Sequence, residues 1–149
     1  MNKDISLSLF PSWALFAVLS AFFAALTALF GKLGVTGINS NLATLIRTII
    51  IFFVIVGIIS LRSEWQKLST ISINSWIFLT LSGIATGLSW LCYYHALQLG
   101  PITKVAPIDK LSVAIAILFG VIFLGEKLTW SIVLGGLLII SGTLILIAL

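Results

Sequence analysis

Charged side chains are scarce in this sequence, which has four acidic and eight basic residues among 149. A soluble domain averages about 25% charged residues, whereas this chain has 8%. This small number of charges cannot cover a water-facing surface. A soluble globular enzyme is therefore excluded. The basic residues are scattered singly and form no run or stripe. A nucleic-acid-binding surface is therefore not expected, despite the net charge of +4.

Cysteine and histidine are equally scarce, with Cys92 and His95 the single residue of each type. One cysteine cannot form an intrachain disulfide. One cysteine and one histidine cannot supply the three or four ligands of a zinc site. The sequence also lacks the GxSxG, HExxH and CxxC motifs and any glycine-rich phosphate loop. We therefore predict a protein that is not an enzyme and that holds no metal or cofactor.

Apolar residues make up 60% of the chain, and they gather in five long runs. A helix that spans a bilayer needs about 20 predominantly apolar residues, and each run approaches this length. The pattern predicts an all-α membrane protein, in which residues 1–149 form a single bundle of five transmembrane helices in the lipid bilayer. The predicted helices cover about residues 12–30, 42–61, 75–97, 103–124 and 130–149.

An odd number of crossings places the two ends of the chain on opposite faces of the membrane. We call the N-terminal face side A, which holds the connections 62–74 and 125–129, and the other face side B. Basic residues in or near the connections favour side A as the cytoplasmic face. Insertion in both orientations remains an alternative, because Arg47 and Lys110 lie just inside side B and remove the difference if they are counted. The basic residues near side A are Lys3, Arg62, Lys67 and Lys127, and those near side B are Lys32 and Lys104.

Three charged residues lie several positions inside the predicted helices, away from the helix ends: Arg47, Asp109 and Lys110. A charge at the centre of a membrane helix costs about 2.5–3.5 kcal/mol, so such residues are expected to face protein or water. Arg47 is about five residues, or roughly 7–8 Å, below side B, and Asp109 is roughly 9 Å below it. These matching depths allow the two side chains to pair. Lys110 follows Asp109 at about 100° around the helix axis, so we predict that it points elsewhere.

A structural alternative exists for each of the two pairing residues. Pro107 suits the first position of a helix, which would place Asp109 in the first turn, where the helix dipole favours a carboxylate. Arg47 could be an anchor at the membrane interface.

Polar and aromatic residues gather near the side-B end of the third run. Trp90, Tyr94 and Gln98 follow one another at four-residue spacing and so share one helix face, which could line a wet cavity and contact a solute. Interfacial anchoring is the alternative for these residues. His95, like Asp109, is a candidate for proton coupling, although a solvated histidine is the simpler interpretation.

Several passages of the sequence match a known family in order and spacing. They are residues 42–48 (LATLIRT), 94–99 (YHALQL), 105–111 (VAPIDKL) and 124–127 (LGEK), followed by Gly135, Gly136 and Gly142 in the last run. Together they resemble the EamA-like branch of the drug/metabolite transporter superfamily. The resemblance implies one repeat of five helices, whereas typical relatives have two such repeats of opposite orientation around a central cavity. It also implies transport of small-molecule metabolites or amphipathic compounds across the inner membrane.

A single repeat implies that two copies act together, as a homodimer that can be inverted, or that the chain pairs with a similar half-size chain. By analogy, the first, third and fourth helices line the cavity. The leading hypothesis is a secondary transporter that works by alternating access, with Arg47 and Asp109 as a switchable pair. A non-transporting membrane accessory protein is an alternative, which predicts no solute flux and tight copurification with an unrelated partner. Translocation of a lipid-linked sugar is another, favoured by a lateral opening between helices.

Overall fold

The computed structural model describes residues 12–148, and within this range the chain is helical without strands. Five segments are long and apolar enough to cross a membrane, which confirms the predicted all-α five-helix fold. The fourth segment, Ile102–Leu124, is interrupted and consists of two helices. The helices are α1 (Ser12–Gly34), α2 (Ser40–Arg62), α3 (Ile73–Leu99), α4 (Ile102–Asp109), α5 (Leu111–Leu124) and α6 (Trp130–Ala148), with a short 3-10 helix at Leu68–Thr70.

Local capping sets the ends of the helices. The Asn39 side chain accepts hydrogen bonds from the backbone N–H groups of Asn41 and Leu42, which begins α2. Ser63 ends α2 in the left-handed region, with φ 54°. α1 and α3 extend beyond their predicted bounds by up to four residues, and for α3 the caps at Ser72 and Gly100 set these ends. Hydropathy marks only the apolar part of a helix, while the helical backbone continues into the polar interface until a cap or turn stops it.

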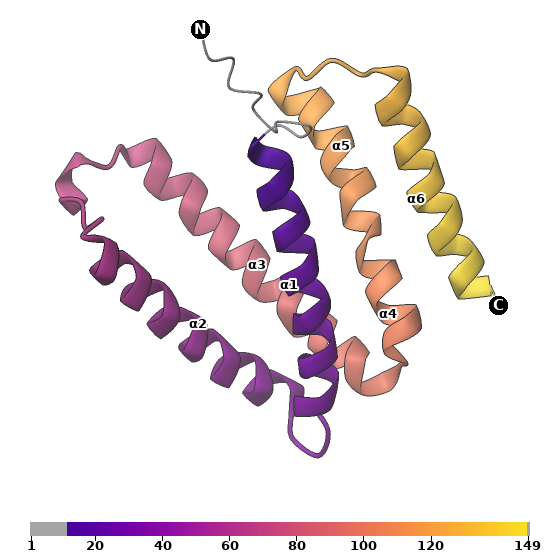
Figure 1. The fold of residues 1–149 in the computed structure, drawn as a ribbon, viewed down its shortest axis with the longest axis horizontal. Coiled ribbons are helices and arrows are strands. Elements are labelled where there is room, and N and C mark those ends of the chain that lie inside the picture. Colours follow the sequence, from indigo (N-terminus) through magenta and orange to yellow (C-terminus); the bar gives the residue numbers. More distant parts are fainter. Residues whose placement is uncertain (1–11, 149) are drawn as a thin grey trace, which may run out of the picture.

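The spans form two hairpins that meet around α1 and α4 (Figure 1). α2 packs against α3, and α5 packs against α6. α1 contacts α3 and α4, which joins the two hairpins. The α1–α2 and α3–α4 connections lie at one end of the bundle, side B, and the α2–α3 and α5–α6 connections lie at the other (Figure 1). The helices converge at side B and spread apart toward side A.

The buried core lies at the convergent end. Val35, Ala43, Tyr94 and Leu97 form one buried cluster, in which Leu97 has no exposed surface. Large apolar side chains elsewhere face outward from every span, as a bilayer environment permits. The bundle is therefore held together mainly at side B.

Two long polar side chains fasten this convergent end. The Lys32 ammonium donates to the carbonyl oxygens of Leu97 and Gly100, at the C-terminus of α3, where a cation is favoured. The Gln98 amide donates to the carbonyl oxygens of Val35 and Ile38 in the α1–α2 connection. These bonds join α1, its following connection and the end of α3 into one rigid corner.

Gly31 allows α1 and α3 to approach closely at this corner. A Cβ atom at position 31 would lie 3.0 Å from the Tyr94 hydroxyl oxygen and 3.2 Å from its ring carbon Cζ. Tyr94 is 4% exposed and packs in the buried cluster, so displacing its ring disturbs that packing. We expect Gly31→Leu to lower the free energy of unfolding by about 1–3 kcal/mol through overpacking.

The matched control is Gly34→Leu, one turn further along α1, where a Cβ atom would meet nothing within 4 Å. Thermal unfolding in detergent, followed by tryptophan fluorescence, should show a lower melting temperature for Gly31→Leu only. Equal melting temperatures for the two variants would show that α1 and α3 are not in close contact at this point.

Candidate functional site

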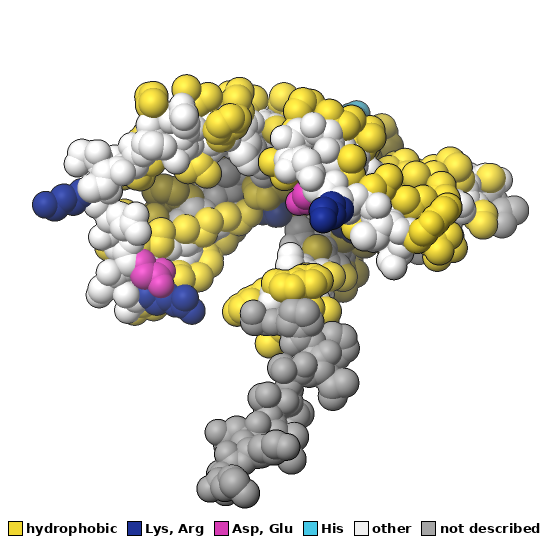
Figure 2. Space-filling model, turned by 90° about the horizontal axis from the view of Figure 1, so that it is seen from above, with side chains coloured by type: hydrophobic (Ala, Val, Ile, Leu, Met, Phe, Trp, Pro, Cys, Tyr) yellow, Lys and Arg dark blue, Asp and Glu magenta, His cyan; other side chains and the backbone are white. Residues whose placement is uncertain are grey.

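A cavity of about 350 Å³ lies where α1 faces α3 and the break between α4 and α5. We call it the polar cavity, because Arg47, Asp109 and Lys110, the charged residues predicted to lie inside the helices, all line it. Figure 2 shows the molecule from the side-A end. The spans arch around a hollow whose walls are largely apolar, and a basic group lies deep inside it. The polar cavity is lined by Ala24, Thr27, Arg47, Ser89, Trp90, Tyr93, Asp109, Lys110 and Ser112.

Arg47 enters this cavity from α2 and stacks on aromatic rings of α3. Its guanidinium carbon lies 3.9 Å from the centroid of the Trp90 ring and 5.3 Å from that of Tyr94. Such cation–π contacts stabilise a partly desolvated cation. The Arg47 Nη1 atom is buried, and the residues that the structure describes offer it no hydrogen-bond acceptor. This geometry differs from that of an interfacial anchor, whose head group reaches water.

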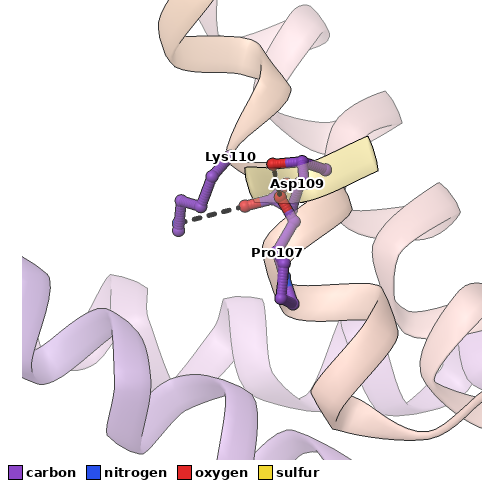
Figure 3. Close-up of polar contacts among 4 residues, drawn as sticks. Pro107, Asp109 and Lys110 are labelled. Atoms are coloured by element: carbon purple, nitrogen blue, oxygen red, sulfur yellow. Dashed lines mark hydrogen bonds and ion pairs between the residues drawn. The ribbon is translucent and has the colours of Figure 1, made fainter. Parts of the chain in front are cut away.

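Asp109 lines the same cavity, but its partner is the neighbouring Lys110 and not Arg47. The Lys110 ammonium lies 3.2 Å from the Asp109 carboxylate (Figure 3). Within residues 12–148, no ion pair of 4.0 Å or less joins Arg47 to Asp109. The prediction that Lys110 points away from Asp109 is therefore wrong. It assumed one continuous helix, whereas α4 ends at Asp109 and the long Lys110 side chain bends back from the turn that follows.

The break between α4 and α5 is built by tightened backbone bonds. Pro107 lies inside α4 and has no N–H group, so it leaves the carbonyl group one turn earlier without its helical donor. The Lys110 N–H donates to the Pro107 oxygen at 3.0 Å, and the Val113 N–H donates to the Lys110 oxygen at 3.0 Å. Both bonds span three residues instead of four, which is typical of 3-10 turns and of hinges within helices. The buried Thr143 hydroxyl of α6 also donates to the Pro107 oxygen, at 3.3 Å.

The alternative that placed Asp109 in a first helical turn after Pro107 is also wrong. The helix begins at Ile102, directly after Pro101, so Asp109 is its last residue. Its carboxylate therefore lies at a helix C-terminus, which disfavours an anion, and just before the N-terminus of α5, which favours one. Asp109 is thus held at the junction of two helix ends inside a membrane span.

A second, larger cavity of about 490 Å³, which is open at one side, adjoins Arg47 between α1, α2 and α3, and several of its wall side chains are exposed. We call it the apolar cavity, because its walls are mainly aliphatic and aromatic. Thr27 and Arg47 line both cavities, so they form a common wall. The other residues of the apolar cavity are Phe30, Gly31, Gly34, Ile38, Ala43, Ile46, Ile50, Ile51 and Tyr94.

The remaining predicted residues of α3 are distributed over different surroundings. Trp90 lines the polar cavity, while Tyr94 belongs to the buried cluster and the wall of the apolar cavity. Gln98 does not line either cavity, and its amide instead holds the α1–α2 connection. His95 is exposed. Their predicted common face therefore does not act as one surface.

Several hydroxyl groups of the polar cavity were missed by reading the sequence. Thr27, Ser89 and Ser112 line it, yet small polar residues inside apolar runs resemble packing residues. Ser112 follows Asp109 by three residues, a spacing that puts two side chains on one face of a continuous helix. The helix is broken between them, yet both residues line this cavity. The other two require knowledge of which helices are neighbours.

Comparison with known proteins identifies the family of the chain. The sequence profile of the EamA-like transporter family matches residues 11–148. The chain belongs to the EamA-like transporter family. The prediction of family from sequence is thereby confirmed, and this EamA-like chain is a multi-pass membrane transporter of the drug/metabolite type.

The EamA-like chain is also similar to a relative from Sinorhizobium sp. described as an "Uncharacterized transporter in cobO 3'region". The two are 54% identical over 135 residues, which cover 91% of this chain and 96% of the relative. No solved structure matches the chain.

Proposed function

We propose that this chain is a secondary transporter of small organic metabolites or amphipathic compounds in the inner membrane, working by alternating access. The observation that carries this proposal is the polar cavity, which collects Arg47, Asp109 and Lys110 within membrane-spanning segments. Each such charge costs about 2.5–3.5 kcal/mol in the middle of a bilayer unless it is sheltered. Ionisable side chains in this setting are typical of substrate and ion pathways.

A dimer of five-helix repeats completes the transporter in this proposal. The helices spread toward side A (Figure 1). Large apolar side chains on these helices are exposed. A second copy packed against the spread ends would enclose the polar cavity between two repeats. An inverted pair matches the weak charge bias between the two faces and the inverted repeats of many transporters. Pairing with a similar half-size chain would serve the same purpose, and side A is the proposed cytoplasmic face.

The break at Lys110 supplies the moving element of the proposed cycle. Asp109 pairs with Lys110 in this conformation and lines the same cavity as Arg47. A change in the angle between α4 and α5 would move the carboxylate from one cation to the other. Exchange of partners by a carboxylate couples an intramembrane charge to a conformational change, and it allows proton coupling through Asp109.

Flux from loaded vesicles tests the proposal. Proteoliposomes containing the chain are loaded with a mixed pool of metabolites, and mass spectrometry measures which solutes leave faster than from vesicles without protein. We expect a pH gradient to change the rate for at least one solute, and Asp109→Asn to abolish that gradient effect. Glu64→Gln is the control, because Glu64 is an exposed carboxylate in the α2–α3 connection.

Two results would contradict parts of this proposal. Unchanged gradient-dependent flux in Asp109→Asn removes Asp109 from the coupling mechanism. Absence of flux for every solute, together with stable copurification of an unrelated membrane protein, would favour the accessory role instead.

A further inference from the structure

The charges in the polar cavity do not cancel. Arg47 and Lys110 are cations, and Asp109 is the only acidic residue that residues 12–148 contribute to the cavity wall. Since Asp109 is paired with Lys110 at 3.2 Å, the charge of Arg47 remains uncompensated by the residues that the structure describes. The cavity therefore carries one excess positive charge, located on the guanidinium group. A buried cation is most stable when an anion reaches it.

Arg47 lies against the ring of Trp90 and also reaches the walls of both cavities. Its guanidinium carbon lies over the Trp90 ring, 3.9 Å from the ring centroid. Stacking uses the face of the group, whereas its N–H bonds point outward along the edge. The buried Nη1 atom has no acceptor among residues 12–148, while the Arg47 side chain lines both cavities. The N–H groups of a guanidinium bind a carboxylate through two parallel N–H···O bonds.

The space beside Arg47 determines what accompanies the acidic group. The apolar cavity shares Arg47 and Thr27 with the polar cavity, and apolar side chains such as Phe30 and Ile50 form its other walls. Its volume of about 490 Å³ is within the range of small-molecule sites. A ligand whose acidic group reaches Arg47 can place an apolar body in this space. An amine is disfavoured there, because it would bring a second positive charge next to Arg47, and the one nearby carboxylate already has a partner.

We infer that the transported solute is a small organic monoanion with an apolar or aromatic body, whose carboxylate binds the edge of Arg47 and whose body fills the apolar cavity. This inference rests on the proposed transport function and narrows it to one substrate class. The single excess charge selects a monoanion over a dianion, and the aliphatic walls select an apolar body over a sugar.

Binding, measured separately from transport, tests the inference. Three probes share one aromatic body and differ in charge: phenylacetate, phenylacetamide and phenethylamine. Calorimetric titration uses the purified full chain in nanodiscs of phosphatidylcholine, which has no net charge. We expect phenylacetate to bind at least about tenfold more tightly than the neutral amide and the amine. Equal or tighter binding of either of these two, or no binding of phenylacetate at millimolar concentration, would overturn the inference.

Substitutions of Arg47 and Lys110 test whether these two side chains cause the preference for the anionic probe. Arg47→Gln should bind phenylacetate and phenylacetamide with similar affinity, and Arg47→Lys should be intermediate, because it keeps the charge and loses the planar edge. Lys110→Gln leaves Asp109 without its partner, so phenylacetate affinity should fall and phenethylamine affinity should rise. An unchanged anion preference in Arg47→Gln would overturn the site. If that variant fails to fold, the wild-type series and Lys110→Gln decide the question.

Two further experiments distinguish this inference from lipid binding at Arg47 and from the proposed transport function. Nanodiscs that contain anionic phosphatidylglycerol should give the same phenylacetate affinity, and loss of binding there would show that Arg47 holds a lipid headgroup instead. Anion-selective binding without flux would overturn the proposed transport and keep the binding site. Flux that is indifferent to solute charge would overturn the binding site and keep the transport.

Discussion

Replacing Arg47 by Gln is expected to slow solute efflux from proteoliposomes by at least about tenfold, because a charge-assisted hydrogen bond contributes about 1.5–3 kcal/mol. The guanidinium group stacks on Trp90 and lines both cavities. A glutamine at this position would keep some polarity but would supply neither the charge nor the paired donors. The rate constant at low solute concentration reports this loss most directly, since it includes both binding and translocation.

Arg62→Gln is the matched control for this experiment. Arg62 ends the same helix, α2, but it is exposed and contacts Glu64 at 3.7 Å. We expect this variant to transport at the wild-type rate, because an exposed ion pair of this kind contributes little. Similar losses in the two variants would mean that α2 needs positive charge for insertion, and that Arg47 has no special part in transport.

The largest effect on stability is expected for Leu97→Ala. Leu97 has no exposed surface and packs in the buried cluster at side B with Val35, Ala43 and Tyr94. Truncating Leu97 leaves a cavity, because the rigidly held residues around it cannot move in to fill the space. In lipid or detergent, the loss consists mainly of van der Waals contacts, so we expect about 2–3 kcal/mol.

Leu99→Ala provides the comparison, two residues further along α3. Leu99 is 78% exposed, so its truncation removes few protein contacts and leaves no internal cavity. Unfolding with increasing sodium dodecyl sulfate, followed by tryptophan fluorescence, should shift strongly for Leu97→Ala and little for Leu99→Ala. Equal shifts would show that side B is not the most tightly packed part of the bundle.

The spans could be predicted from sequence because hydrophobic length alone determines them. Each predicted run overlaps a span, and the odd number of spans places the start of α1 and the end of α6 at opposite ends of the bundle. Composition and motif order also sufficed to identify the family. The interruption at Lys110 was missed because hydropathy is continuous from Ile102 to Leu124 and does not report backbone hydrogen bonding.

The candidate site was harder to predict than the spans. Depth arithmetic placed Arg47 and Asp109 at one level, and the structure does bring both to the polar cavity. Which partner each side chain takes depends on the local backbone, as the pairing of Asp109 with Lys110 shows. Gln98 lies on the same helix face as Trp90, but two turns further along. Its amide donates hydrogen bonds to the α1–α2 connection instead. Face alone therefore does not define a cavity.

The unequal ends of the bundle have a consequence for an antiparallel pair. Lys32, Gln98 and the buried cluster fix one end of each copy, while the other end is spread. Two such copies in opposite orientation would place one stiff end and one loose end at each surface of the bilayer. Each copy would then pivot about its own stiff end, and the two pivots would lie on opposite sides of the solute. Access from the two compartments would be governed by different copies of the same chain.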